Sequence, residues 1–157
     1  RDYYAARGLG DVYKRQELTL ALLQDRENQN LDEIDKKERL IAQLKQEKLE
    51  LRTWTFWQTP IYKKVMSLSE QKEVDKKARK VMTDVEREKL KKTVFEIYAD
   101  YISPLQAQYS QLTEDDLLVL CLQEAGISPL AISLCFGHTD TVALNQRKSR
   151  LKKKMSE

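Results

Sequence analysis

The richest group of side chains for ligand recognition lies near the carboxyl end, between residues 141 and 154. It combines amides, hydroxyls and cations and contains no carboxylate. Asn and Gln amides can each form two hydrogen bonds with the edge of an adenine, and short hydroxyl or apolar side chains approach bases without clashing. A Lys or Arg charge binds phosphate oxygens without reading sequence. This chemistry suits double-stranded DNA as the ligand.

Helical spacing assigns a role to each of these residues. Leu144, Leu151 and Met155 fall seven and then four residues apart, which predicts a narrow apolar stripe that docks a helix on a small core. The side chains expected to face bases are Thr141, Val142, Asn145, Gln146 and Ser149. Those expected to contact phosphates are Arg147, Lys148, Arg150, Lys152 and Lys153. The alternative is a basic helix that only complements its own dipole.

Two further helices are predicted directly before this one. Thr113 is an N-cap with Asp116 three residues later, and the apolar run that follows ends at Gly126, a residue suited to a left-handed C-cap. A cap and a proline, Ser128-Pro129, begin a short helix that Gly137 ends. Thr139 or Asp140 is expected to cap the third helix. This layout predicts a trihelical helix-turn-helix domain over residues 111–157.

Several motifs of this segment resemble the LuxR-type helix-turn-helix, whose relatives include region 4 of sigma factors. They are Leu112-Thr113, Gly126-x-Ser128, Ile132, Phe136 and Leu144-x-x-Arg147-x-x-x-Leu151-x-x-Lys154-Met155. The run from Gln146 to Met155 is most similar to a group of Bacteroidetes-type regulators, in which tetratricopeptide repeats, a membrane helix, a coiled coil and a linker domain precede this module. Ala131 and His138 depart from the usual pattern, and the turn before Leu144 is one residue longer.

The resemblance implies a function, a location and partners. We expect sequence-specific binding of double-stranded DNA by the output part of a bacterial transcription regulator, with RNA polymerase as a further partner. A cytoplasmic location is implied, on a longer parent protein that a helix further upstream tethers to the membrane. The alternative is a coiled-coil interaction module that docks on polymerase or another regulator without touching DNA. Acidic Glu114, Asp115 and Asp116 favour that alternative.

The amino-terminal part is expected to contain one long helix. Residues 17–53 lack Gly and Pro, and a heptad frame places Leu20, Leu23, Ile34, Ile41, Leu44 and Leu51 on one seam. The same frame puts Glu27, Asn30, Lys37 and Lys48 there, so a homodimeric coiled coil and a surface helix on its own domain both stay open. Residues 1–16 include Asp-Val-Tyr-Lys-Arg-Gln, which resembles a translated sequencing adapter. We therefore interpret 1–16 as an unstructured artefact in a fragment.

A helical linker domain is predicted for residues 54–110. Thr59-Pro60 begins one helix, and the capping box from Thr83 to Glu86 begins another that Pro104 kinks or splits. Residues 69–82 are compatible with either helix or loop. The tryptophans and tyrosines of this region are expected in the core rather than as a platform for bases.

Composition excludes other classes of protein. Four glycines and three prolines in 157 residues indicate an all-α fold. One histidine, no glycine-rich phosphate loop and no Ser/His/Asp arrangement lead us to expect no enzyme and no cofactor. Cys135-x-x-His138 with Cys121 could supply metal ligands, but the spacing favours core packing, so no metal is expected. No stretch in the sequence is long and apolar enough for a membrane span.

Overall fold

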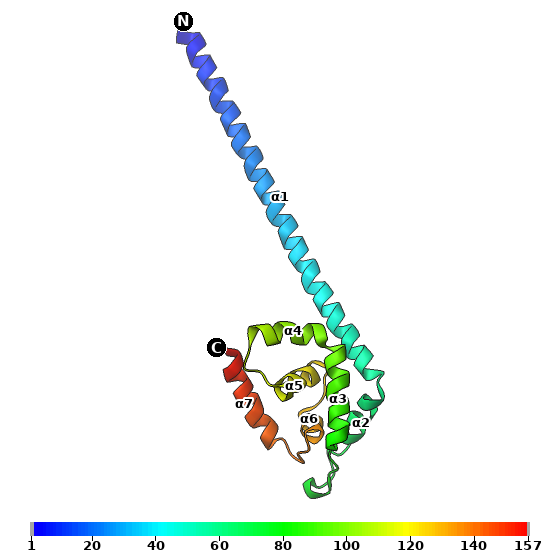
Figure 1. Cartoon of the computed structure of the whole chain (residues 1–157). Helices are drawn as coiled ribbons and strands as arrows, with labels where there is room; N and C mark the ends of the chain where they lie inside the picture. Colours follow the sequence, from blue (N-terminus) through cyan, green and yellow to red (C-terminus); the bar gives the residue numbers. More distant parts are fainter. Residues whose placement is uncertain (1, 157) are drawn as a thin grey trace. The chain divides into compact units, whose positions relative to one another are not determined.

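The structure is a computed structural model that describes the backbone of residues 2–156 and the side chains of residues 8–156. Within that range the chain is all-α, with no strand, as the composition predicts. It divides into two units, Arg1–Glu47 and Lys48–Glu157. The elements in Figure 1 are α1 (Asp2–Trp57), α2 (Pro60–Ser69), the 3-10 turn η1 (Lys76–Ala78), α3 (Asp84–Ile97), α4 (Ala99–Gln108), α5 (Glu114–Glu124), α6 (Pro129–Cys135) and α7 (Val142–Ser156).

The first unit is the amino-terminal part of α1. Every side chain from Gly8 to Lys48 is exposed, including the whole predicted seam over that range. The expectation that residues 1–16 lack structure differs from the structure, which continues α1 to Asp2. No proline interrupts this segment, and glycine costs a helix only about 1 kcal/mol. No helix of the described range is apolar over a sufficient length to cross a bilayer.

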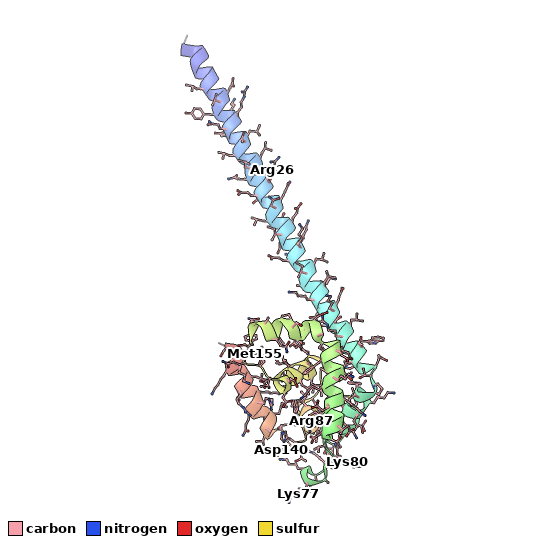
Figure 2. The ribbon with its side chains drawn as sticks, in the orientation of Figure 1. Arg26, Lys77, Lys80, Arg87, Asp140 and Met155 are labelled. Atoms are coloured by element: carbon pink, nitrogen blue, oxygen red, sulfur yellow. The ribbon has the colours of Figure 1, made fainter. Side chains whose placement is uncertain are left out.

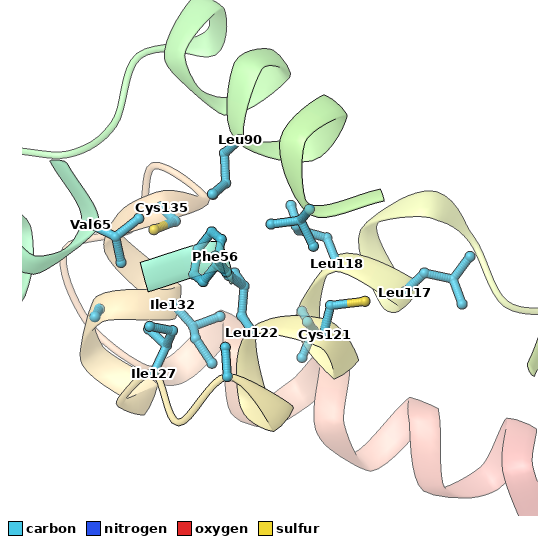
Figure 3. Close-up of a cluster of buried hydrophobic side chains, with 14 of the residues drawn as sticks. Phe56, Val65, Leu90, Leu117, Leu118, Cys121, Leu122, Ile127, Ile132 and Cys135 are labelled. Atoms are coloured by element: carbon cyan, nitrogen blue, oxygen red, sulfur yellow. The ribbon is translucent and has the colours of Figure 1, made fainter. Parts of the chain in front are cut away.

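The second unit packs around one apolar core. Phe56, at the end of α1, is fully buried and lies among Val65 of α2, Leu90 of α3 and Ile132 of α6 (Figure 3). Helices α5 and α6 pack together, α2 and α7 both contact α6, and α3 contacts α5. Residues 54–110 and 111–157, predicted as a linker domain and a terminal domain, both contribute to this core and belong to the same unit.

The predicted helix starts are confirmed by the hydrogen bonds at their caps. Thr59 and Ser128 accept bonds from the amides three residues on, and a proline follows each of them. Thr83 and Thr113 each form a reciprocal capping box, with Glu86 and with Asp116. Gly126 has a φ of 78°, the left-handed conformation expected after α5.

Three features of the linker segment differ from the prediction or decide between alternatives that the sequence left open. The helix predicted to begin at the Thr83 capping box breaks at Tyr98, which separates α3 from α4, whereas Pro104 lies inside α4. Tyr98 is buried, and its hydroxyl shares a hydrogen bond with the Thr53 hydroxyl at 2.8 Å. Residues 70–83 form a loop with the single turn η1. Trp54 and Trp57 are exposed by 56% and 44%, so the aromatic core of this segment consists of Phe56 and Tyr98 instead.

Candidate nucleic-acid interface

Helix α7 is docked on the core by the predicted apolar stripe. Leu144 and Leu151 are each only 4% exposed, and Met155 is partly buried near the carboxyl end of the helix (Figure 2). The Asp140 carboxylate accepts a hydrogen bond at 3.1 Å from the amide of Val142, the first residue of the helix. The face of α7 opposite Leu144 and Leu151 is consequently left in solvent.

A buried carboxylate adds an electrostatic anchor. The Asp116 side chain is 3% exposed, and its Oδ1 accepts a hydrogen bond from Arg147 at 2.9 Å. Its Oδ2 accepts bonds from Lys154 at 2.7 Å and from the Thr113 amide at 3.0 Å. Arg147 also lies over the Phe136 ring, at 5.7 Å from its centroid. Asp116 thus ties the start of α5 to two residues of α7 that lie about two helical turns apart.

The hydrogen bonds at Asp116 control its ionisation. Burial alone raises the pKa of this carboxyl, but the bonds from Lys154, the Thr113 amide and Arg147 outweigh that cost and lower the pKa to about 2. The carboxylate therefore stays charged at neutral pH. A charge that is buried with two cations and a backbone amide is compensated, as a stable interior ion requires.

The outward face of α7 carries the predicted base-reading residues. Val142, Asn145, Gln146 and Ser149 are all exposed, while Thr141 is half-buried and its carbonyl accepts a hydrogen bond from the Asn145 amide. With 3.6 residues per turn, the line farthest from Leu144 runs through Val142, Gln146, Ser149 and Lys153. Asn145 lies on one side of this line.

The cations of α7 divide into two groups. Arg150, Lys152 and Lys153 are exposed, and Lys148 is half-buried beside Leu120 and Leu151. Arg147, predicted to contact phosphate, pairs with buried Asp116, and its guanidinium lies 4.0 Å from Asp115. It therefore anchors the helix, and its contact with phosphate stays a prediction. The sequence signal that could have revealed this pairing is an acid inside an apolar run, since such an acid needs a cationic partner.

Two arginines outside the predicted domain brace the turn that leads into α7. Arg87 of α3 donates a hydrogen bond to the Cys135 carbonyl at 2.7 Å, and Arg79 donates one to the Thr139 carbonyl at 2.8 Å. The Met82 amide bonds the Leu134 carbonyl at 3.0 Å. These contacts bracket the glycine turn at Gly137, where φ is 84°. These contacts leave no signal in the sequence, because their acceptors are backbone carbonyls, which every residue carries.

The two cysteines are packed in the core. Burial raises the pKa of the Cys121 and Cys135 thiols to about 12. In the described part of the chain, no three His, Cys, Asp or Glu side chains are grouped to hold a metal ion. His138 is exposed in the turn before α7.

No protein-family model, curated protein or solved structure matches the chain.

Proposed function

We propose that this chain binds double-stranded DNA in a sequence-specific manner, as the output part of a bacterial transcription regulator of LuxR-like type. The single observation that carries the proposal is the two-sided build of α7. One side is fixed by Leu144, Leu151 and the Asp116 network, and the other presents Gln146 and Asn145 to solvent. A recognition helix needs both properties, because it must hold its angle while its side chains reach base edges.

Charge around that face supports the same proposal. Arg150 and Lys152 lie on opposite sides of the outward line, where the two walls of a major groove would bring phosphates. No carboxylate is present between Val142 and Ser156. Phosphate attraction on both flanks positions a helix without specifying sequence, so the amides can supply the specificity.

The acidic residues that favoured a protein-docking module are engaged within the unit. Glu114 and Asp115 both approach Lys91, at 3.7 and 3.2 Å, and Asp116 is buried. These charges balance cations of the same chain. Of the three acids, only Asp116 is withdrawn from the surface, so the support that they give the alternative is reduced.

The test of specificity is selection of bound sequences from random DNA duplexes by the full chain. We expect enrichment of a short site that contains adenines. The Asn145→Ala and Gln146→Ala variants should lose the preference at one or two positions, by about 1–3 kcal/mol for each bidentate pair. Gln106→Ala, an exposed amide on α4, serves as the matched control and should select the same site. Failure of the chain to enrich any sequence would remove the proposal.

The flanking cations are tested by salt dependence. Removing Arg150 and Lys152 together should lower the slope of log affinity against log salt concentration by about 2, for specific and random duplexes alike. The matched control replaces Lys89 and Lys92, two exposed lysines of α3. An equal change in both variants would show that only total charge matters.

We also propose that two copies of the chain pair through residues 17–53. Leu20, Ile34, Ile41 and Leu44 of the predicted seam are each at least half exposed, at 61%, 52%, 52% and 50%. A long helix with no packing partner is marginal in water, and a second copy offers the same seam. Sedimentation of the full chain should give a dimer mass, and the Ile34→Lys/Ile41→Lys variant should give a monomer. A monomeric parent chain contradicts the pairing.

A further inference from the structure

The loop between α2 and α3 places a second group of cations next to the start of α7. The loop carries Lys76, Lys77 and Lys80, all exposed, after the last of its acidic residues. Figure 2 labels Lys77 and Lys80 on this loop, with Asp140 of the turn nearby. The acidic residues of the loop fall in its first half, at Glu70, Glu73 and Asp75.

Arg79 holds this loop in one shape. Its guanidinium group donates hydrogen bonds to the carbonyls of Gln71 at 3.3 Å, Lys72 at 3.1 Å and Val74 at 3.1 Å. Gln71 closes the loop from the other side, because its side chain bonds the Lys80 carbonyl at 2.8 Å and the Lys80 amide at 2.7 Å. The loop is therefore pinned by side chains at its base, although it has only one turn of regular structure.

The same arginine connects the loop to the proposed recognition helix. Arg79 Nη1 donates to the Thr139 carbonyl at 2.8 Å, three residues before α7 begins at Val142. The guanidinium of Arg79 donates its hydrogen bonds to these backbone carbonyls, whereas the side chains of the neighbouring lysines lie in solvent. The loop therefore holds these lysines near the amino-terminal end of α7, which is the end that would enter the groove.

We propose that Lys76, Lys77 and Lys80 form a second DNA contact, which binds backbone phosphates beside the groove occupied by α7. This inference rests on the proposed function and extends it to a segment outside the helix-turn-helix. Lysine suits the task because a mobile point charge binds phosphate without demanding a fixed geometry. Arg79 acts as the positioning residue that keeps the lysines next to α7.

The test compares two triple variants of the full chain on one mixed-sequence DNA duplex. The loop variant replaces Lys76, Lys77 and Lys80 by Ala, and the control replaces Lys63, Lys89 and Lys92 of α2 and α3, which are equally exposed. Three lost phosphate contacts should lower the salt slope by about 2.7 per chain. Between about 50 and 200 mM salt, the affinity of the loop variant should then change about 40-fold less than that of the parent.

The outcomes separate this inference from the proposed function. A parent chain that binds no duplex removes both. A parent that binds while the loop variant keeps its slope, or while the control variant loses as much slope, overturns the loop contact and leaves the proposed function standing. Single substitutions, each expected to lower the slope by about 0.9, decide the matter if the triple variant does not fold.

Discussion

Asp116→Asn gives the sharpest test of how α7 is held. The substitution keeps the shape of the side chain but removes its charge, so one oxygen is left for the three donors at Arg147, Lys154 and the Thr113 amide. The new amide NH2 group then faces a cation. Because the carboxylate is 3% exposed, solvent cannot replace the lost contacts.

The size of the effect follows from the pKa of Asp116. The fold lowers this pKa from 3.8 to about 2. One pKa unit corresponds to about 1.4 kcal/mol, so the folded state favours the charged carboxylate by about 2.5 kcal/mol. Since the pKa is lower in the folded than in the unfolded chain, this stabilisation is complete above about pH 4 and is lost as the pH falls to about 2.

Urea unfolding followed by tryptophan fluorescence measures the effect, because Trp54 and Trp57 both belong to the second unit. At pH 7 we expect Asp116→Asn to lower the free energy of unfolding by about 2.5 kcal/mol, and the difference from the parent should shrink toward zero near pH 2. Asp100→Asn is the matched control. Its carboxylate is 72% exposed and pairs with Arg52, so a loss below about 1 kcal/mol is expected. A pH-independent difference, or one as small as the control, refutes the reasoning.

Three further predictions concern the core, the turns and the thiols. Phe56→Ala should destabilise the second unit by about 4 kcal/mol in urea unfolding, while Trp54→Ala, two residues away and exposed by 56%, should change stability by less than about 0.5 kcal/mol. Gly126→Ala should cost about 1 kcal/mol from its positive φ alone, and Gly137→Ala should cost more, because the added Cβ meets Arg87 Nη2 at 3.0 Å; equal losses contradict this. Cys121 and Cys135 should react with a thiol reagent at pH 8 only after denaturant is added, since burial raises the pKa of each to about 12; rapid labelling of the native chain would mean that the second unit opens.

The helices could be predicted because their signals are local. Thr59, Thr83, Thr113 and Ser128 each lie three residues from the amide they cap, and both partners can be recognised in the sequence. The break at Tyr98 could not be found this way. The break coincides with a buried tyrosine whose hydroxyl bonds Thr53, 45 residues earlier, and no residue near Tyr98 encodes that contact.

The candidate site was predictable where side-chain direction follows from helical spacing. Leu144 and Leu151 fix which face of α7 is buried, so the exposure of Asn145, Gln146 and Ser149 follows. The pairing of Arg147 with Asp116 was not predictable, because Asp116 lies 31 residues earlier in the chain. The charge of a side chain predicts which groups it can bind. Only the tertiary fold decides whether a carboxylate of the same chain lies close enough to pair with it.

This division of the cations limits how many charges of α7 the proposed DNA interface can use. Of the cations on α7, Arg147 and Lys154 neutralise Asp116, so Lys148, Arg150, Lys152 and Lys153 remain for phosphates. A reader that used this helix alone would have a salt slope of at most about 4 per chain, whereas the three loop lysines raise the limit to about 6. Arg79 joins the loop to the turn before α7 through its bond to the Thr139 carbonyl. The proposed interface is therefore one surface built from two segments, and its angle on DNA is set by the bracing arginines as well as by the apolar stripe.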